Sequence, residues 1–153
     1  MMNVLDVAIY LKQKYQKQYG EIISEMKLHK MLYFAQRESL IEDGIPIFSE
    51  EFEGWKYGPI LPTVRRYYPD IIRSTVGKVD HRSKDILDYI VKKYGCKDAW
   101  SLSRLTHGEY SWQKSRIGVA PYDNSDRTIN IEDIRVDAER IKDRRRMLNM
   151  LKG

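Results

Sequence analysis

The sequence has little cysteine and histidine and no long hydrophobic run. A single cysteine, Cys96, among 153 residues excludes an intrachain disulfide framework and any zinc site built from clustered cysteines. No stretch of 18 apolar residues occurs, so no transmembrane helix is predicted. Residues 1–16 carry Asp6 ahead of Lys12 and Lys14, which is not the basic-then-apolar order of a signal peptide. We therefore expect a cytoplasmic protein that has no membrane partner.

The sequence patterns of common enzyme classes are missing as well. The glycines are scattered singly, and no P-loop, GxGxxG or GxSxG pattern occurs. None of the three histidines belongs to an HExxH motif, and a zinc site needs three or four convergent ligands. Cys96 follows a predicted helix C-terminus, where the helix dipole disfavours a reactive thiolate. We predict a protein that is not an enzyme and that holds no cofactor and no metal.

The composition is that of a globular domain with an uneven charge distribution. Hydrophobic residues make up 42% and charged residues 32%, which predicts one domain, residues 1–153, with a single core. Residues 81–153 carry 16 Lys or Arg against 11 Asp or Glu, whereas residues 1–80 carry 11 of each. The net charge of +5 therefore lies entirely in the second half. Such asymmetry favours an anionic partner, although solvated helices often show a similar excess.

Apolar spacing and helix-capping residues predict a mainly helical fold. The fold class is mainly α: a compact single-domain helical bundle with a small β-hairpin element. Predicted helices cover 4–19, 24–43, 63–68, 83–94, 98–107, 111–117 and 130–151. Two short strands, 47–48 and 52–56, are predicted around a turn at 49–51. The segment 70–81 is compatible with an edge strand or with an apolar loop.

The helix predicted at 24–43 carries its apolar residues on one stripe. Leu28, Met31, Leu32 and Ala35 recur at spacings of three and four residues. The charged residues of this helix lie mostly off the stripe, at Lys27, Lys30, Arg37, Glu38 and Glu42.

An aromatic block lies between the second and third predicted helices. It contains Trp55 and Tyr57, followed by the turn signal Gly58-Pro59. One interpretation is structural: large aromatic side chains cover the helical core while Gly58 supplies an unusual backbone angle. The other is a platform for a partner, because Trp and Tyr dominate protein–protein hot spots.

The last predicted helix combines an apolar stripe with dense basic charge. The stripe runs through Ile131, Ile134, Ala138, Ile141, Leu148 and Leu151, and Arg145 falls inside it. Arg140, Arg144, Arg145 and Arg146 form the densest basic run of the chain. These arginines are candidates for binding an anionic partner. Alternatively they form the solvent-facing side of the helix, on which Arg145 snorkels or pairs with a carboxylate of the same helix such as Asp143.

Three sequence blocks resemble those of a known family. Residues 27–36, KLHKMLYFAQ, resemble the K-L-x-K-L-L-Y-[FL]-A-Q helix of the Panacea domain, also called the SocA-like or GepA-like antitoxin domain. Residues 52–62, FEGWKYGPILP, resemble its F-E-A-W-x-Y-G-P-V-x-P block. Residues 94–112 are similar to its Y-G…L-S-x-L-T-H-x-E-x-P-W block. Gly54 and Ser111 depart from the pattern, which usually has Ala and Pro there.

The resemblance implies an antitoxin of a type II toxin–antitoxin system. Members of this family neutralise protein toxins by direct protein–protein contact and are often encoded on phages or other mobile elements. The expected partner is a cognate toxin, and the resemblance also implies an adaptor role that hands the toxin to a protease. The identity of the toxin does not follow from the motifs.

The same blocks indicate candidate site residues. Thr106, His107, Glu109 and Trp112 stand at the end of one predicted helix and the start of the next. We expect this turn to meet the aromatic block at 55–59 and to form a polar and aromatic cluster with it. The pattern leaves open whether the cluster braces the fold or contacts a toxin.

Two other functions remain as alternatives. The first is a nucleic-acid-binding regulator that uses the basic final helix, although no clear helix-turn-helix occurs. The second is a metal-dependent enzyme built on His107 and Glu109, the least favoured of the three functions.

Overall fold

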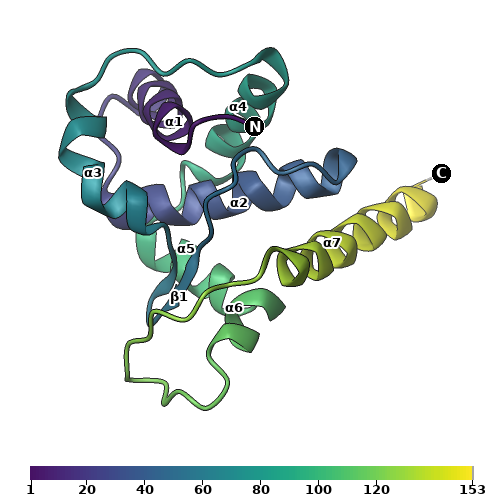
Figure 1. Cartoon of the computed structure of the whole chain (residues 1–153). Coiled ribbons are helices and arrows are strands. Elements are labelled where there is room, and N and C mark those ends of the chain that lie inside the picture. The colour runs from purple at the N-terminus through teal and green to yellow at the C-terminus, as the bar shows by residue number, and fades with distance from the viewer. Residues whose placement is uncertain (153) are drawn as a thin grey trace.

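The computed structural model describes residues 1–152 and is mainly helical, with one small antiparallel sheet (Figure 1). In chain order the elements are α1 (Val4–Tyr19), α2 (Glu25–Asp43), β1 (Glu53–Trp55), β2 (Gly58–Ile60), α3 (Pro62–Arg73), α4 (His81–Tyr94), α5 (Ala99–His107), α6 (Tyr110–Ser115) and α7 (Ile131–Lys152). This confirms the predicted fold class. The buried apolar side chains form one continuous core. Among the described residues, no helix is both long and apolar enough to span a membrane.

Helix α2 lies at the centre of the molecule. Helices α1, α3 and α4 pack on one side of it, and α5, α7 and the hairpin pack on the other (Figure 1). Its basic residues Lys27, Lys30 and Arg37 are therefore buried, whereas Glu38 and Glu42 stay nearer the surface. The stripe pattern did not predict this burial, because it describes one face of the helix and other elements cover the remaining faces.

Capping residues set the ends of the first two helices, as predicted. The side chain of Asn3 accepts a hydrogen bond from a backbone N–H in the first turn of α1, and Ser24 does the same for α2. Gly20 and Gly44 end these helices with φ values of 75° and 77°, in the left-handed region.

The hairpin lies further along the chain than predicted. Strands β1 and β2 pair antiparallel, and residues 56–57 connect them. The predicted strand at 47–48 and the predicted turn at 49–51 are wrong, and only 53–55 of the predicted strand 52–56 is extended in a ladder.

A buried side chain explains why the segment before the hairpin needs no strand partner. The Oε1 atom of Gln36 accepts from the N–H of Ile47 at 2.8 Å, and its Nε2 donates to the carbonyl of Phe48 at 2.8 Å. These bonds satisfy the backbone polar groups that a ladder would otherwise satisfy. On its other edge, strand β1 forms an isolated antiparallel bridge between Glu53 and Thr128, which lies in the loop between α6 and α7.

Helix α3 continues through Pro69, so the predicted helix end at Tyr68 is wrong. The ring is accommodated because Tyr67 leaves helical geometry, with φ of −104° and ψ of 16°, which kinks the helix. Of the undecided segment 70–81, the first part completes α3, and residues 74–80 form an irregular connection.

Helices α4 and α6 begin earlier than predicted. The N-cap of α4 is Asp80, whose carboxylate accepts from the N–H of Ser83 at 2.8 Å, so Ser83 lies inside the helix. Ser111 lies inside α6, and its N–H donates to Asp137 at 2.9 Å. Helix α6 also ends two residues before the predicted end at Ile117.

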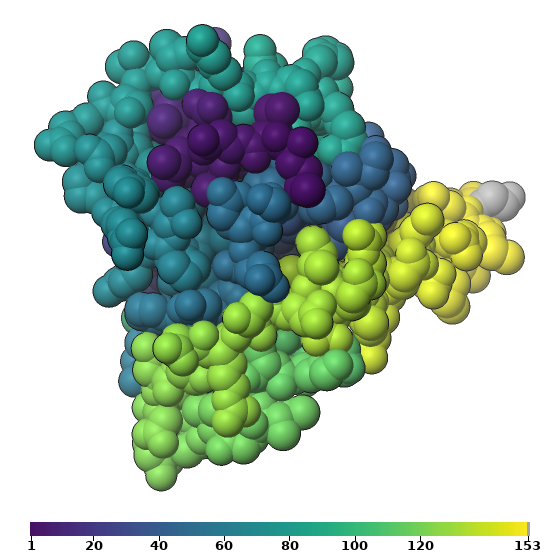
Figure 2. All heavy atoms as spheres, viewed as in Figure 1, coloured from purple at the N-terminus to yellow at the C-terminus, as the bar shows by residue number. Residues whose placement is uncertain are grey.

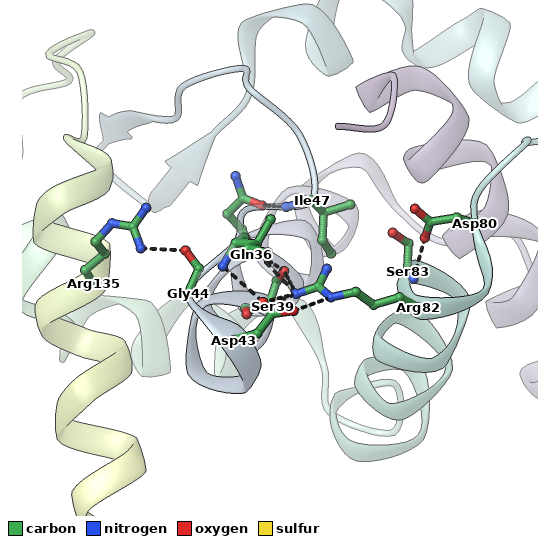
Figure 3. Close-up of polar contacts among 10 residues, drawn as sticks. Gln36, Ser39, Asp43, Gly44, Ile47, Asp80, Arg82, Ser83 and Arg135 are labelled. Atoms are coloured by element: carbon green, nitrogen blue, oxygen red, sulfur yellow. Dashed lines mark hydrogen bonds and ion pairs between the residues drawn. The ribbon is translucent and has the colours of Figure 1, made fainter.

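A polar cluster ties the C-terminal end of α2 to α4 and α7 (Figure 3). The Nε atom of Arg82 donates to the carboxylate of Asp43 at 2.8 Å, and Nη2 donates to the hydroxyl of Ser39 at 2.8 Å. Arg135 donates to the carbonyl of Gly44 at 2.7 Å. The contact to Gly44 satisfies a carbonyl group just beyond the helix end, where α2 offers no N–H partner.

Helix α7 starts as predicted but leaves the body before it ends. The side chain of Asn130 accepts a hydrogen bond from a backbone N–H of the first turn. Ile134 and Ala138 of the predicted apolar stripe are buried, whereas Leu148 and Leu151 are exposed. The reason is that the C-terminal part of α7 projects past the rest of the molecule (Figures 1 and 2).

Candidate partner-binding site

The structure brings the aromatic hairpin against the turn between α5 and α6. The indole Nε1 of Trp112 donates to the carbonyl of Trp55 at 2.8 Å. The ring of His107 stacks on Trp112, with ring centroids 4.1 Å apart and planes at 9°. Burial lowers the pKa of His107, which favours the neutral imidazole. The hydroxyl of Ser103 donates to the carbonyl of Tyr57 at 2.5 Å, so two hydrogen bonds fix the hairpin to α5 and α6.

Gly58, Pro59 and Thr106 are buried in this contact. Gly58 has a φ of 121°, and a Cβ on it would lie 2.6 Å from Thr106 Oγ1 and 2.9 Å from Lys30 Cε. A side chain at this position would strain the backbone and collide with its neighbours. These three candidate site residues therefore have a structural role, because they hold the hairpin closely against α2 and α5.

Aromatic rings on the outer side of the hairpin are exposed. Tyr57 is 48% exposed and meets Trp100 of α5 edge to face, with centroids 5.2 Å apart. Trp100 itself is 55% exposed. The guanidinium of Arg65 lies over the ring of Trp55 at 4.9 Å. The sequence patterns did not indicate Trp100, although an aromatic residue in the first turn of a helix beside a family motif is a usable signal.

Glu109 is placed apart from this cluster. Its carboxylate forms a buried ion pair with Arg37 of α2, and Arg37 also donates to the hydroxyl of Tyr94 at 3.0 Å. Burial raises the pKa of Glu109, and the guanidinium of Arg37 opposes that shift. Glu109 therefore belongs to the core, where its carboxylate pairs with Arg37 and makes no hydrogen bond to His107, the partner that an enzyme site would need. Within residues 1–152, no three His, Cys, Asp or Glu side chains gather as metal ligands would.

Beside the exposed aromatic rings lies a pocket of about 490 Å³. It is bounded by α2, the hairpin, the start of α3 and Asn124 of the loop before α7, and its wall includes His29, Lys30, Trp55 and Arg65. The sequence motifs contain both His29 and Lys30, but only the packing of three elements shows that they face one cavity.

A hydrogen-bonded chain forms one wall of the pocket. His29 Nδ1 accepts from the N–H of Leu61 at 3.1 Å, so Nε2 carries the proton and donates to Glu25 at 3.0 Å. Burial lowers the pKa of His29, which keeps the ring neutral. Glu25 also accepts from Arg65 at 3.2 Å. The pKa of the Glu25 carboxyl is lowered, mainly by its hydrogen bond with His29.

Lys30 is the most buried charged side chain of the pocket, with 1% of its surface exposed. Burial lowers the pKa of its ammonium group from 10.5 to about 8. The sequence pattern placed Lys30 off the apolar stripe, and only the letter K in the helix motif hinted at a special role.

The candidate arginines of α7 do not form a single free patch. Arg145 makes a two-pronged pair with Glu38 of α2, at 2.7 and 2.9 Å. Arg140 lies over the ring of Tyr110, and Arg146 is 3.4 Å from Asp143 in an exposed pair. Arg144 is exposed. Arg145 is thus paired, as one interpretation of the sequence predicts, but its carboxylate partner lies on α2 and not within α7.

Comparison with known proteins agrees with the three motif blocks. Residues 28–113 match the family model described as antitoxin SocA-like, Panacea domain. A curated relative, antitoxin SocA of Caulobacter vibrioides (strain NA1000 / CB15N), is 44% identical over 46 residues. That segment covers 30% of this chain and 24% of the relative, so the likeness spans about a quarter of the relative's length. No solved structure gave a significant match. Since the family match covers more than half of the chain, the chain belongs to the SocA-like antitoxin family with a Panacea domain.

Proposed function

We propose that this protein is a type II antitoxin that neutralises a cognate protein toxin by direct binding, without enzymatic chemistry of its own. Family membership supports the antitoxin role. The observation that carries the binding proposal is the pair of exposed rings, Tyr57 and Trp100, beside the pocket whose wall includes the half-buried Trp55. Aromatic side chains that border a cavity are typical anchors of protein–protein interfaces, because they bury much apolar area for little loss of side-chain freedom.

The rigid mounting of this surface supports the same proposal. The hairpin is fixed to α5 and α6 through Ser103 and Trp112, so Tyr57 is held in place before a partner arrives. A preorganised surface loses less conformational entropy on binding than a mobile one. A standard interface buries about 800 Å² on each partner, which is roughly a tenth of this protein's accessible surface of 8454 Å².

The test is co-expression with the product of the neighbouring open reading frame. We expect the protein to restore growth and to co-purify with that product. The double variant Tyr57→Ala, Trp100→Ala should lose both effects while remaining folded. Tyr89→Ala is the matched control, because Tyr89 is 41% exposed on α4 and lies away from the hairpin face. Growth arrest that persists despite well-expressed protein would refute the antitoxin role.

A second candidate function, binding to nucleic acid, rests on the exposed Arg140, Arg144 and Arg146 along the projecting part of α7. It predicts affinity for duplex DNA that weakens steeply with salt. The variant Arg144→Gln, Arg146→Gln should reduce that affinity and, because Arg145 is left in its pair with Glu38, should leave the fold intact. No DNA binding at low salt would eliminate this function.

A further inference from the structure

Lys30 differs from the other buried basic residues of the described chain. Lys12, Lys27, Arg37 and Arg116 each donate hydrogen bonds to carbonyl, hydroxyl or carboxylate oxygens within 3.3 Å. Lys30 is buried more completely than any of them, yet within residues 1–152 its ammonium has no hydrogen bond and no ion pair. Its Nζ is not among the buried side-chain atoms that lack a partner, so the ammonium is reached from the pocket, and an acceptor that enters the pocket from outside the chain would offset the cost of this charge.

The surroundings of Lys30 leave one direction for that acceptor. Gly58 closes one side, since Lys30 Nζ lies 3.6 Å from the place of a Cβ on that residue. The acidic neighbour, Glu25, is more than 4 Å away and is already bonded to His29 and Arg65. The ammonium lines the pocket, and an acceptor that enters the pocket can reach it.

The charge and the walls of the pocket narrow the chemistry of its occupant. Lys30, Lys56 and Arg65 contribute positive charge, Glu25 contributes one negative charge, and His29 is held neutral. The rings of Trp55 and Tyr57 and the side chains of Met26 and Ile60 make the rest of the wall mostly apolar. Lys56 lies over the ring of Tyr57 and Arg65 is engaged with Glu25 and Trp55, so the buried Lys30 is the one of the three cations left for an acceptor, and a doubly charged phosphate would be only half balanced by it. A carboxylate on an aliphatic stem fits both the charge and the walls.

We propose that the pocket binds an acidic side chain, Asp or Glu, of the partner protein, and that Lys30 is the group that pairs with its carboxylate. This inference rests on the proposed toxin-binding function and specifies its anchor. The aromatic rings around the pocket exclude water once the partner is seated, which strengthens the pair beyond that of an exposed ion pair.

The first test uses Lys30→Met in the complex with the toxin. We expect affinity for the toxin to fall by about 30-fold or more, because the partner's carboxylate is then buried without a cation. The free variant should be at least as stable as the unmodified chain, which a structural role for Lys30 would not allow. Lys93→Met, which removes an exposed lysine of α4, serves as the control and should leave affinity unchanged.

The outcomes separate the two proposals. A Lys30→Met variant that binds and neutralises the toxin as well as the unmodified chain overturns this inference and leaves the proposed function standing. An unmodified chain that binds no toxin overturns the proposed function instead.

The second test needs no toxin and probes the pocket directly. The capped dipeptide acetyl-Leu-Glu-amide, its acetyl-Leu-Gln-amide counterpart and inorganic phosphate are each titrated into the free protein, with the pKa of Lys30 read from its ¹³Cε resonance. We expect the Glu peptide to raise the pKa above about 8 and the Gln peptide to leave it unchanged. A larger rise with phosphate than with the Glu peptide, or equal effects of the two peptides, overturns the proposal.

Discussion

Two buried cations on one helix have opposite surroundings. Lys30 and Arg37 lie seven residues apart on α2, about two helical turns, and so on nearly the same face. Arg37 donates to Glu109 and Tyr94, and only its Nε lacks a partner, whereas Lys30 has no acceptor among residues 1–152 and opens into a pocket. A satisfied buried charge fixes neighbouring elements in place. An unsatisfied one beside a cavity weakens the fold and marks a place where another molecule completes the structure.

The region around Arg37 extends this contrast. Asp137 of α7 accepts from the N–H groups of Tyr110 and Ser111 at 2.8 and 2.9 Å, and from the hydroxyl of Tyr33 at 3.2 Å. Burial raises the pKa of Tyr33 well above its usual value. Apart from the Nε atom of Arg37, the groups that join α2, α6 and α7 here have partners, so we assign this network to stability and the Lys30 pocket to recognition.

The largest expected effect is the loss of stability when the buried, paired Arg37 is replaced. Arg37→Met leaves the carboxylate of Glu109 buried without its partner and should lower the free energy of unfolding by about 3–5 kcal/mol, measured by urea denaturation. The double variant Arg37→Met, Glu109→Leu should recover part of this loss, because no charge remains unpaired. A loss below about 1 kcal/mol for the single variant would mean that this pair does not hold α2 to the α5–α6 turn.

Lys30→Met should have the opposite sign. Because burial lowers the pKa of Lys30 from 10.5 to about 8, the charged form is disfavoured in the folded state, and removing it should stabilise the free protein at pH 7 by up to about 3 kcal/mol. Between pH 8 and 10.5 the unfolded chain binds more protons at Lys30, so this group makes stability rise with pH. The difference in free energy of unfolding between Lys30→Met and the unmodified protein should therefore shrink from pH 8 to pH 10.5. All other titrating groups are common to both proteins and cancel in this difference. A constant difference would contradict the shifted pKa.

Gly58→Ala tests how closely the pocket is built around Lys30. We expect a loss of about 1–3 kcal/mol from the positive φ and from the contacts with Thr106 and Lys30. Gly20→Ala is the matched control, because Gly20 also has a positive φ but no atom within 4 Å of the added Cβ. Equal losses for the two variants would show that only backbone strain matters at Gly58.

The smallest effect is expected at the surface pair of α7. Arg145 is partly exposed in its pair with Glu38, so a double-mutant cycle with Arg145→Gln and Glu38→Gln should give a coupling energy of about 1 kcal/mol or less, decreasing in high salt. A coupling as large as the loss at Arg37 would remove the distinction between buried and surface pairs.

Much of the fold followed from local signals. Ser24, Gly20 and Gly44 set helix ends through side-chain caps and left-handed backbone angles, which depend on a few neighbouring residues. The predicted strand at 47–48 is wrong because the side chain of Gln36, on the preceding helix α2, bonds the backbone groups that a neighbouring strand would bond. The helix end predicted at Tyr68 is wrong because the kink at Tyr67 makes room for the ring of Pro69 inside α3.

The family, the helical class and most helix ends could be predicted from the residues alone, since they depend on motifs and on short-range hydrogen bonds. The burial of charged residues on α2, the pairing of Glu109 with Arg37 and the exposure of Lys30 to a pocket became visible only once the helices were packed together. The physical reason is that burial and pairing depend on which elements cover each face of a helix. Those elements come from segments far apart in the chain.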